Sequence, residues 1–206
     1  IDKHRWNVLV CHRRFGKTVC MINHLIRSAL LSKLNNPRFA YIAPTFKQAK
    51  SIAWDYMKQF TAKIPHTKFN ETELRVDLPN GSRITLLGSE SPDGLRGIYL
   101  DGCVIDEYAN VNSKLFPEII RPALSDRKGY CVFIGTPMGM NNNFYELYQH
   151  AQSAEDWFNY KAKASDTKIV DQDELDKAKQ VMGEKKYMQE FECDWIANIE
   201  GSVYGD

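Results

Sequence analysis

The chain has 206 residues, a length typical of one large domain or two small ones. Its 43% of hydrophobic residues can fill a buried core, which excludes a largely disordered protein. Its 27 basic and 26 acidic residues leave a formal charge of +1, so a nucleic-acid partner would have to bind a local patch. The apolar runs are too short to span a membrane. The five cysteines form no CxxC pair, which argues against a disulfide framework or a zinc cage and fits a reducing cytosol.

Short apolar runs typical of β-strands alternate with helical periodicity along most of the chain. The first strand is expected over 6–10, and the following helix over 17–34. Its predicted apolar face contains Met21, Leu25, Ala29 and Leu30. A second strand over 38–43 precedes a helix over 46–62. The predicted apolar face of this second helix contains Ile52, Ala53, Tyr56, Met57 and Phe60.

The next segments predict more strands and helices. Residues 68–88 alternate between apolar and polar around a Pro-Asn-Gly turn, which is typical of a β-hairpin. The remaining strands are expected over 101–106, 129–135 and 157–164, and the remaining helices over 112–124, 142–153 and 173–194, the last broken near Gly183. This alternation predicts an α/β fold with a mostly parallel sheet covered by helices on both faces. In such sheets, ligands bind at the carboxyl ends of the strands.

The segment after the first predicted strand has the pattern of a phosphate-binding loop. It reads Cys11-His12-Arg13-Arg14-Phe15-Gly16-Lys17-Thr18. In GxxxxGK[ST] loops, backbone N–H groups surround the phosphates, the lysine reaches the β- and γ-phosphates, and the hydroxyl holds Mg²⁺. The last three positions match, whereas Cys11 stands where the opening glycine is expected. The alternative is a helix N-terminus with a nearby lysine, but the flanking strand and helix favour a nucleotide site.

Two further strand ends carry polar residues. Asp106 and Glu107 end an apolar strand, so Asp106 can lie beside the Mg²⁺ ion, and a neighbouring carboxylate can polarise the water that attacks the γ-phosphorus. The alternative for this acidic pair is a solvated strand end or a helix cap. Thr136, after the 129–135 strand, would emerge close to the γ-phosphate if that strand neighbours the Asp106 strand. The alternative for Gly135-Thr136-Pro137 is a simple turn.

Other nucleotide and metal sites lack their signatures. The chain has no NKxD guanine motif, which disfavours a Ras-like GTPase. It has no GxGxxG after a strand, which disfavours a dinucleotide enzyme. Its five histidines have no metal-ligand spacing.

In this order, the motifs resemble those of the ATPase domain of the large terminase subunit, the motor that packages DNA into capsids of tailed bacteriophages and herpesvirus-type viruses. The resemblance covers nearly the whole chain. It rests on the arginine-rich loop, Tyr41-Ile42-Ala43-Pro44-Thr45 with Gln48, Leu95-Arg96-Gly97 before Asp106-Glu107, and Gly135-Thr136-Pro137 with Gly139 and Phe144-Tyr145. It implies a RecA-like P-loop NTPase fold of the ASCE class, with the β-hairpin as an insertion.

The resemblance also implies roles for individual residues. Residues 11–18 would bind the nucleotide, with Lys17 at the phosphates and Thr18 at Mg²⁺. Asp106 would be the second metal ligand and Glu107 the catalytic carboxylate. Thr136 would couple the phosphate state to the moving parts.

An arginine that contacts the γ-phosphate is a further expectation from this family. Arg96, on a loop flanked by Gly94 and Gly97, is the predicted finger acting on a neighbouring subunit. Arg13 or Arg14 from the phosphate loop is the alternative within the same subunit. For any of the three, the non-catalytic alternative is a loop or surface salt bridge.

The expected cofactors are ATP and Mg²⁺, and the expected function is translocation of double-stranded DNA into a procapsid in the host-cell cytoplasm. The expected partners are the portal protein, the procapsid, the small terminase subunit and further copies in a homo-oligomeric ring, a pentamer, with no membrane. The alternatives are a helicase-type DNA-dependent ATPase and an assembly protein that binds ATP without hydrolysing it.

Because the chain does not begin with Met, we expect a longer protein whose adenine-contacting segment precedes Ile1. The motor domain is predicted over 1–194, and the start of a linker to a nuclease domain over 195–206. This fragment is expected to hydrolyse ATP weakly or not at all alone, and not to cut DNA.

Overall fold

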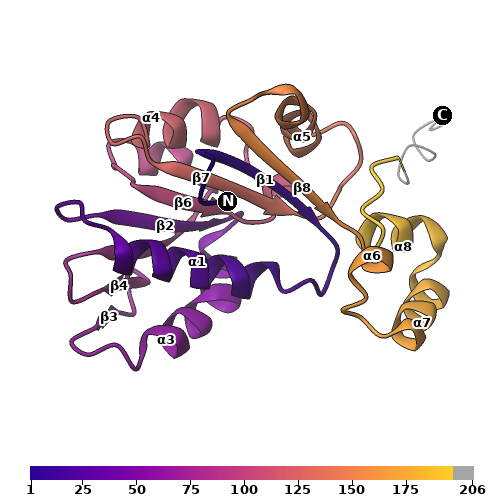
Figure 1. Ribbon diagram of the computed structural model, residues 1–206, viewed down its shortest axis with the longest axis horizontal. Coiled ribbons are helices and arrows are strands. Elements are labelled where there is room, and N and C mark those ends of the chain that lie inside the picture. The colour runs from indigo at the N-terminus through magenta and orange to yellow at the C-terminus, as the bar shows by residue number, and fades with distance from the viewer. Residues whose placement is uncertain (197–206) are drawn as a thin grey trace.

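The computed structural model describes residues 1–196, in which one eight-stranded sheet is covered by helices on both faces (Figure 1). The strands are β1 (Trp6–Cys11), β2 (Arg38–Ala43), β3 (Lys68–Asn70), β4 (Arg75–Asp77), β5 (Arg83–Gly88), β6 (Gly102–Ile105), β7 (Tyr130–Gly135) and β8 (Trp157–Ala162). The α-helices are α1 (Lys17–Leu31), α2 (Phe46–Ala49), α3 (Asp55–Thr61), α4 (Arg121–Ala123), α5 (Asn143–Ser153), α6 (Ala164–Thr167), α7 (Gln172–Met182) and α8 (Glu184–Glu190). Two π-helical segments, η1 (Lys50–Trp54) and η4 (Leu115–Ile120), and two 3₁₀ segments, η2 (Pro92–Leu95) and η3 (Tyr108–Asn110), complete the described elements.

The strand order brings the three predicted motifs together. The order is β3-β4-β5-β2-β6-β7-β1-β8, and every pair from β5 to β8 is parallel. This confirms the mostly parallel sheet. The strands that precede Cys11, Asp106 and Thr136 are neighbours in the order β1, β7, β6, so their carboxyl ends meet at one edge.

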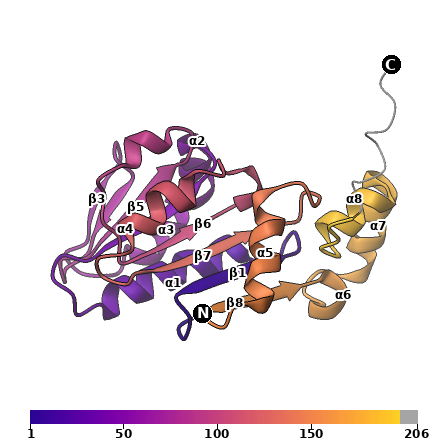
Figure 2. The same cartoon turned by 90° about the horizontal axis from the view of Figure 1, so that it is seen from above.

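Both faces of the sheet are buried, because successive side chains of a strand point to opposite faces. Leu9 and Cys11 of β1 pack in the core under α1 and α3, whereas Val8 and Val10 pack in the core that includes η4 and α5. Figure 2 shows α5 lying across the sheet on the second side.

Helices α6, α7 and α8 form a separate helical unit at one end of the sheet (Figure 1). Its small core consists of Ala164, Leu175, Tyr187 and Phe191. The predicted break near Gly183 is confirmed: this glycine, with φ +77°, separates α7 from α8. The unit follows β8, the edge strand beside β1, so it lies next to the loop that follows β1.

The predicted hairpin is confirmed in β4 and β5, which pair antiparallel. However, β5 also pairs in parallel with β2, from Arg38–Arg83 to Ala43–Gly88. The hairpin therefore extends the main sheet instead of standing apart from it, and β3 forms the far edge.

Two helices differ from their predictions in detail. The first ends at Leu31 rather than Leu34, because Ser32 is extended and its hydroxyl accepts a hydrogen bond from the Leu34 N–H. Leu30, which was predicted on the apolar face, is 40% exposed and lies outside the buried face. In the second helix, Ile52 and Tyr56 are exposed, because the π-helical turn η1 shifts the buried face. That face consists of Ala49, Ala53, Trp54, Met57 and Thr61.

The described residues beyond α8, 191–196, remain in contact with the domain. Trp195 is buried against the rings of Phe144, Tyr145 and Tyr148 in α5. Residues 197–206 of the predicted linker lie outside the described residues, so the boundary at 194 stays a prediction. Within residues 1–196, no helix combines the length and apolar character needed to cross a membrane.

Candidate nucleotide-binding site

The loop between β1 and α1 is shaped by two left-handed residues and one lysine. Arg14 has φ +69° and Gly16 has φ +84°, and Gly16 precedes the first residue of α1. The Lys17 Nζ atom donates to the carbonyl oxygens of Cys11, at 3.3 Å, and His12, at 3.1 Å. Within the described chain, no side chain caps this end of α1. Its N–H groups and helix dipole therefore favour an anion in the loop.

Cys11 fits the place of the expected opening glycine because it is still part of β1. Its side chain is buried, and its backbone lies outside the left-handed region. Burial raises the pKa of its thiol to about 12, so the side chain is a neutral thiol at neutral pH. The loop therefore closes without a glycine at this position.

Asp106 is fixed by three hydrogen bonds. Its Oδ2 atom accepts from the Thr18 hydroxyl, at 3.2 Å, and from the Tyr41 hydroxyl, while its Oδ1 atom accepts from the Glu107 N–H, at 2.8 Å. Asp106 is 3% exposed and Tyr41 is fully buried. The structure therefore brings the predicted metal-binding pair, Thr18 and Asp106, together.

Tyr41 was not among the residues predicted for the site. A hydroxyl in the buried run 39–43 of strand β2 is the one sequence signal that points to a polar partner, because a buried hydroxyl requires one. Burial and the adjacent Asp106 carboxylate raise the pKa of Tyr41, which keeps the phenol protonated as a donor.

Glu107 directly precedes η3 and has a left-handed conformation, with φ +48°. Burial and the neighbouring Asp106 raise the pKa of its carboxyl group, and the positive charge of Lys17 opposes this shift. A carboxylate with a raised pKa is a better proton acceptor than an ordinary glutamate. Its place beside the loop makes it a candidate general base.

These groups surround a cavity of about 300 Å³, here called the phosphate cavity. Its walls come from the loop, the ends of β6 and β7, and helix α8. The lining residues are Arg13, Lys17, Glu107, Asn110, Thr136, Met138, Lys186, Gln189 and Glu190. Thr136 therefore lies at the same cavity as Glu107, as the strand order requires. Sequence reasoning missed the α8 residues, since no motif marks them.

Paired oxygen donors next to the phosphate loop suit Mg²⁺, a hard cation that binds through one or two carboxylates together with substrate phosphates. The Thr18 hydroxyl and the Asp106 carboxylate supply such oxygens. In residues 1–196, no cluster of three or more Asp, Glu, His or Cys residues could hold a metal without the substrate.

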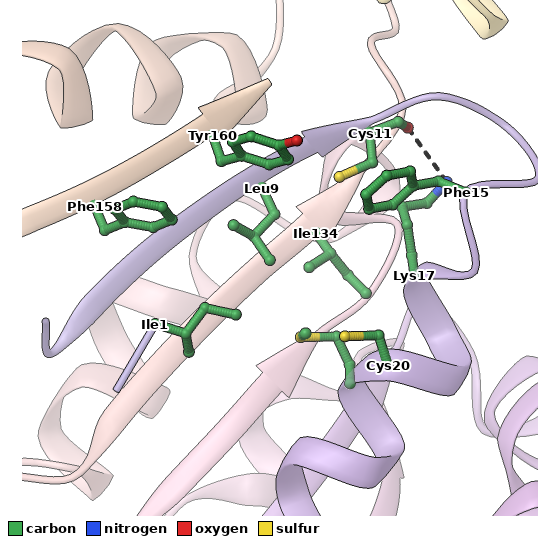
Figure 3. A pocket seen from close by; sticks show the side chains of 10 residues that line it. Ile1, Leu9, Cys11, Phe15, Lys17, Cys20, Ile134, Phe158 and Tyr160 are labelled. Atoms are coloured by element: carbon green, nitrogen blue, oxygen red, sulfur yellow. Dashed lines mark hydrogen bonds between the residues drawn. The ribbon is translucent and has the colours of Figure 1, made fainter. Parts of the chain in front are cut away.

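A second cavity, of about 320 Å³, lies on the other side of Lys17 (Figure 3). It is lined almost entirely by apolar side chains of β1, α1, β7 and β8, and is here called the apolar pocket. These are Ile1, Leu9, Cys11, Phe15, Lys17, Cys20, Met21, Ile134, Phe158 and Tyr160. Phe15, predicted to bind nucleotide, faces this pocket and not the phosphate cavity.

His12, also predicted to bind nucleotide, turns away from both cavities. It is fully buried, and its Nδ1 lies 2.6 Å from the Arg13 carbonyl oxygen while its Nε2 lies 2.8 Å from Thr167 Oγ1 in α6. A carbonyl only accepts, so Nδ1 carries the proton and Nε2 accepts from Thr167. Burial lowers the pKa of His12, which favours this neutral form. Its side chain thus attaches the loop to the helical unit.

The three candidate arginines lie in different surroundings. Arg13 lines the phosphate cavity, whereas Arg14 is exposed and lines neither cavity described above. Arg96 lies away from the phosphate cavity, beside η2 and η4. There its Nε donates to Asp93, at 2.8 Å, and a terminal nitrogen lies 3.7 Å from Glu118. The side chain of Arg96 is 58% exposed, so the solvent can reach it.

Comparisons with known proteins agree with this fold. A curated relative, the terminase large subunit of Thermus phage G20c, is 30% identical over 126 residues, covering 52% of this chain and 26% of that protein. The chain thus spans about a quarter of its length. The solved Thermus phage P74-26 large terminase ATPase domain has a TM-score of 0.78 and 21% identity, covering 94% of this chain and 89% of that one. A large terminase from a thermophilic bacteriophage, solved with ADP, has a TM-score of 0.81 and 16% identity, covering 95% and 49%.

These structural similarities establish the fold predicted from the sequence. A family model extends the match along the chain: the model of the terminase large subunit, T4likevirus-type, N-terminal, matches residues 10–205. That range includes the phosphate loop, both carboxylates and α8. The chain therefore belongs to the family of terminase large subunits, of which it represents the N-terminal part.

Proposed function

We propose that this chain is the ATP-hydrolysing motor domain of a terminase large subunit, which drives double-stranded DNA into a procapsid. The observation that carries the proposal is the arrangement of Thr18, Asp106 and Glu107 around the lysine of a phosphate loop. The names of the relatives and the nucleotide bound to a structural neighbour support it.

In this proposal, the triphosphate enters the phosphate cavity from the loop. Lys17 exchanges its two carbonyl partners for the phosphates, and the N–H groups at the start of α1 bind the remaining phosphate oxygens. Thr18 and Asp106 would hold Mg²⁺, which would neutralise negative charge on the phosphates. Glu107 accepts a proton from the attacking water, and Thr136 lies beside the γ-phosphate.

The base of the nucleotide fits the apolar pocket. Lys17 borders both cavities, so a ligand whose phosphates lie at Lys17 can extend toward Phe15 and Tyr160. Aromatic side chains favour a base because stacking contributes about 1–3 kcal/mol per base. This placement assigns Phe15 a role at the base and not at the phosphates.

The decisive substitution for the hydrolysis step is Glu107→Gln, which keeps the shape of the side chain but removes its basicity. Loss of a general base lowers kcat by about 10²–10⁴-fold, while affinity for ATP is retained. Turnover is measured in the full-length protein assembled with portal, procapsid and DNA. Glu155→Gln, at an exposed glutamate in the turn between α5 and β8, is the matched control. Undiminished turnover in Glu107→Gln would refute the assignment of Glu107.

We also propose that Arg96 acts on the nucleotide of a neighbouring subunit in a ring. Its exposure and its distance from the phosphate cavity of its own chain support this role over one within the subunit. Arginine fingers contribute about 10³–10⁵-fold to the rate. Mixing Arg96→Ala subunits with Lys17→Ala subunits should restore part of the turnover, because some interfaces then combine an intact finger with an intact loop. Failure to restore turnover in an assembled ring would favour Arg13 as the finger.

The partners predicted from the sequence belong to the same proposal. The motor would act with a portal protein, a procapsid, the small terminase subunit and further copies of itself in a pentameric ring. If it does, portal, procapsid and DNA together should raise ATP turnover above the level of the free protein. Equal turnover with and without the three components would argue against a packaging motor.

A further inference from the structure

Helix α8 completes the phosphate cavity with charged side chains. Lys186 and Glu190, one helical turn apart on α8, line the same cavity as Arg13, Lys17 and Glu107. The cavity wall therefore combines residues from the sheet edge with residues of α8 that lie about 50 positions or more further along the chain. A third positive side chain thus borders the space where a terminal phosphate would lie.

Glu190 connects two of the three positive groups. Its carboxylate lies 2.9 Å from Lys186 Nζ and 3.9 Å from an Arg13 guanidinium nitrogen, and its side chain is only 13% exposed. A partly buried carboxylate requires such partners, because leaving it unpaired costs free energy. Glu190 therefore holds Lys186 and Arg13 at the cavity through its negative charge.

The backbone fixes α8 relative to the phosphate loop. The Arg13 N–H donates to the Glu190 carbonyl oxygen, at 2.8 Å, and His12 bonds to Thr167 of the same helical unit. These contacts do not involve the charged ends of Lys186 and Glu190. The separation between the loop and the end of α8 therefore stays the same when these side chains change partners.

We propose that Lys186 binds the terminal phosphate of the nucleotide in its own chain, and that Glu190 competes with this phosphate for Lys186 and Arg13. This inference rests on the proposed function, because it requires a nucleotide in the phosphate cavity. The terminal phosphate replaces the Glu190 carboxylate as the partner of both cations. A diphosphate, which lacks this group, leaves the Lys186–Glu190 pair intact. The helical unit would then distinguish ATP from ADP.

The experiment measures the affinities of ADP and of a non-hydrolysable ATP analogue, with Mg²⁺, by calorimetry on the same chain. Lys186→Ala should weaken binding of the ATP analogue by about tenfold and leave ADP binding nearly unchanged, because one charge-assisted contact is lost. Lys186→Arg should keep the preference for the ATP analogue. Glu190→Gln should have the opposite effect and strengthen binding of the ATP analogue several-fold. The backbone bond to Arg13 is retained in this variant, because the carbonyl oxygen of residue 190 still accepts from the Arg13 N–H.

Lys179→Ala is the matched control. Lys179 on α7 pairs with Glu184 at 2.9 Å, and its side chain is 46% exposed, compared with 48% for Lys186. It should leave both affinities unchanged. Thermal melting of each variant checks that the fold is retained.

The outcomes separate this inference from the proposed function. If the unsubstituted chain binds both nucleotides but Lys186→Ala changes their affinities equally or not at all, the role of Lys186 is overturned and the nucleotide site remains. If Glu190→Gln weakens binding of the ATP analogue, the competition is overturned. If the unsubstituted chain binds neither nucleotide, the proposed function fails, and this inference fails with it.

Discussion

The two cavities that border Lys17 have similar volumes but opposite chemistry. The phosphate cavity, of about 300 Å³, is lined by three positive and two acidic side chains, whereas the apolar pocket, of about 320 Å³, has Lys17 as its one charged residue. The same loop separates them, since Arg13 faces one and Phe15 the other. Volume therefore does not tell which end of a ligand each cavity accepts. The charges of the lining side chains indicate which end of a ligand each cavity accepts.

The largest loss of nucleotide affinity is expected from a substitution at Lys17, where the two cavities meet. Lys17→Ala removes the one side chain that contacts both, together with its bonds to the loop carbonyls. Loss of contacts from a charged group to phosphates should weaken ATP and ADP binding alike, by about 100-fold. Calorimetry with each nucleotide measures this change. Lys179→Ala serves again as the control, and a loss confined to ATP would show that Lys17 contacts only the terminal phosphate.

The next prediction compares the stability effects of two tyrosine hydroxyls: that of Tyr41, which binds Asp106, and that of Tyr160, which lines the apolar pocket. Tyr41→Phe removes a donor from the buried Asp106 carboxylate and should lower the free energy of unfolding by about 1–3 kcal/mol. Tyr160→Phe removes a hydroxyl from a residue of the apolar pocket that is 45% exposed, and should change it by less than about 0.5 kcal/mol. Urea unfolding without nucleotide compares the two variants. Equal effects would mean that the Tyr41 hydroxyl contributes nothing specific to the site.

Substitutions in the apolar pocket should weaken the binding of ATP and of ADP to the same extent. Phe15→Ala removes an aromatic ring from the proposed base site, which should weaken ATP and ADP binding by about tenfold each. Phe15→Leu, which keeps the apolar volume but not the ring, should lie between Phe15→Ala and the unsubstituted chain. Because the base is common to both nucleotides, an effect on ATP alone would contradict the placement of the base.

The smallest effect concerns the cost of ionising Glu107 in the phosphate cavity. Its pKa is raised in the folded chain, so the folded state binds this proton more tightly than the unfolded state does. The ionised form therefore destabilises the fold at neutral pH. Without nucleotide, Glu107→Gln should raise the melting temperature at pH 7 to 8, and the difference should shrink as the pH falls toward 4.5, the ordinary glutamate pKa. A difference that grows toward acidic pH would contradict this assignment.

The sequence was informative wherever local chemistry decides the structure. The phosphate loop, the acidic pair after β6 and the strand before Thr136 could be predicted, because each is a short segment with a recognisable pattern. The strand order then placed the three at one edge, as expected for a parallel sheet.

Tertiary contacts account for what the sequence left open. The bond from Tyr41 to Asp106 requires β2 to lie beside β6, which no local pattern specifies. Lys186 and Glu190 reach the cavity only because the helical unit attaches to the loop through His12 and Arg13. The buried face of the second helix was predicted with an ordinary helical period, and the π-helical turn changed that period.

The central position of β6 has a mechanical consequence. The strand is hydrogen-bonded to β2 on one side and to β7 on the other, so Asp106 and Glu107 follow a strand that is held on both sides. Displacing them would break two ladders of backbone bonds at once. The helical unit touches the loop through a few bonds and has its own small core. If the chain is the ATPase motor proposed above, we expect hydrolysis to displace the helical unit relative to the strands of the sheet.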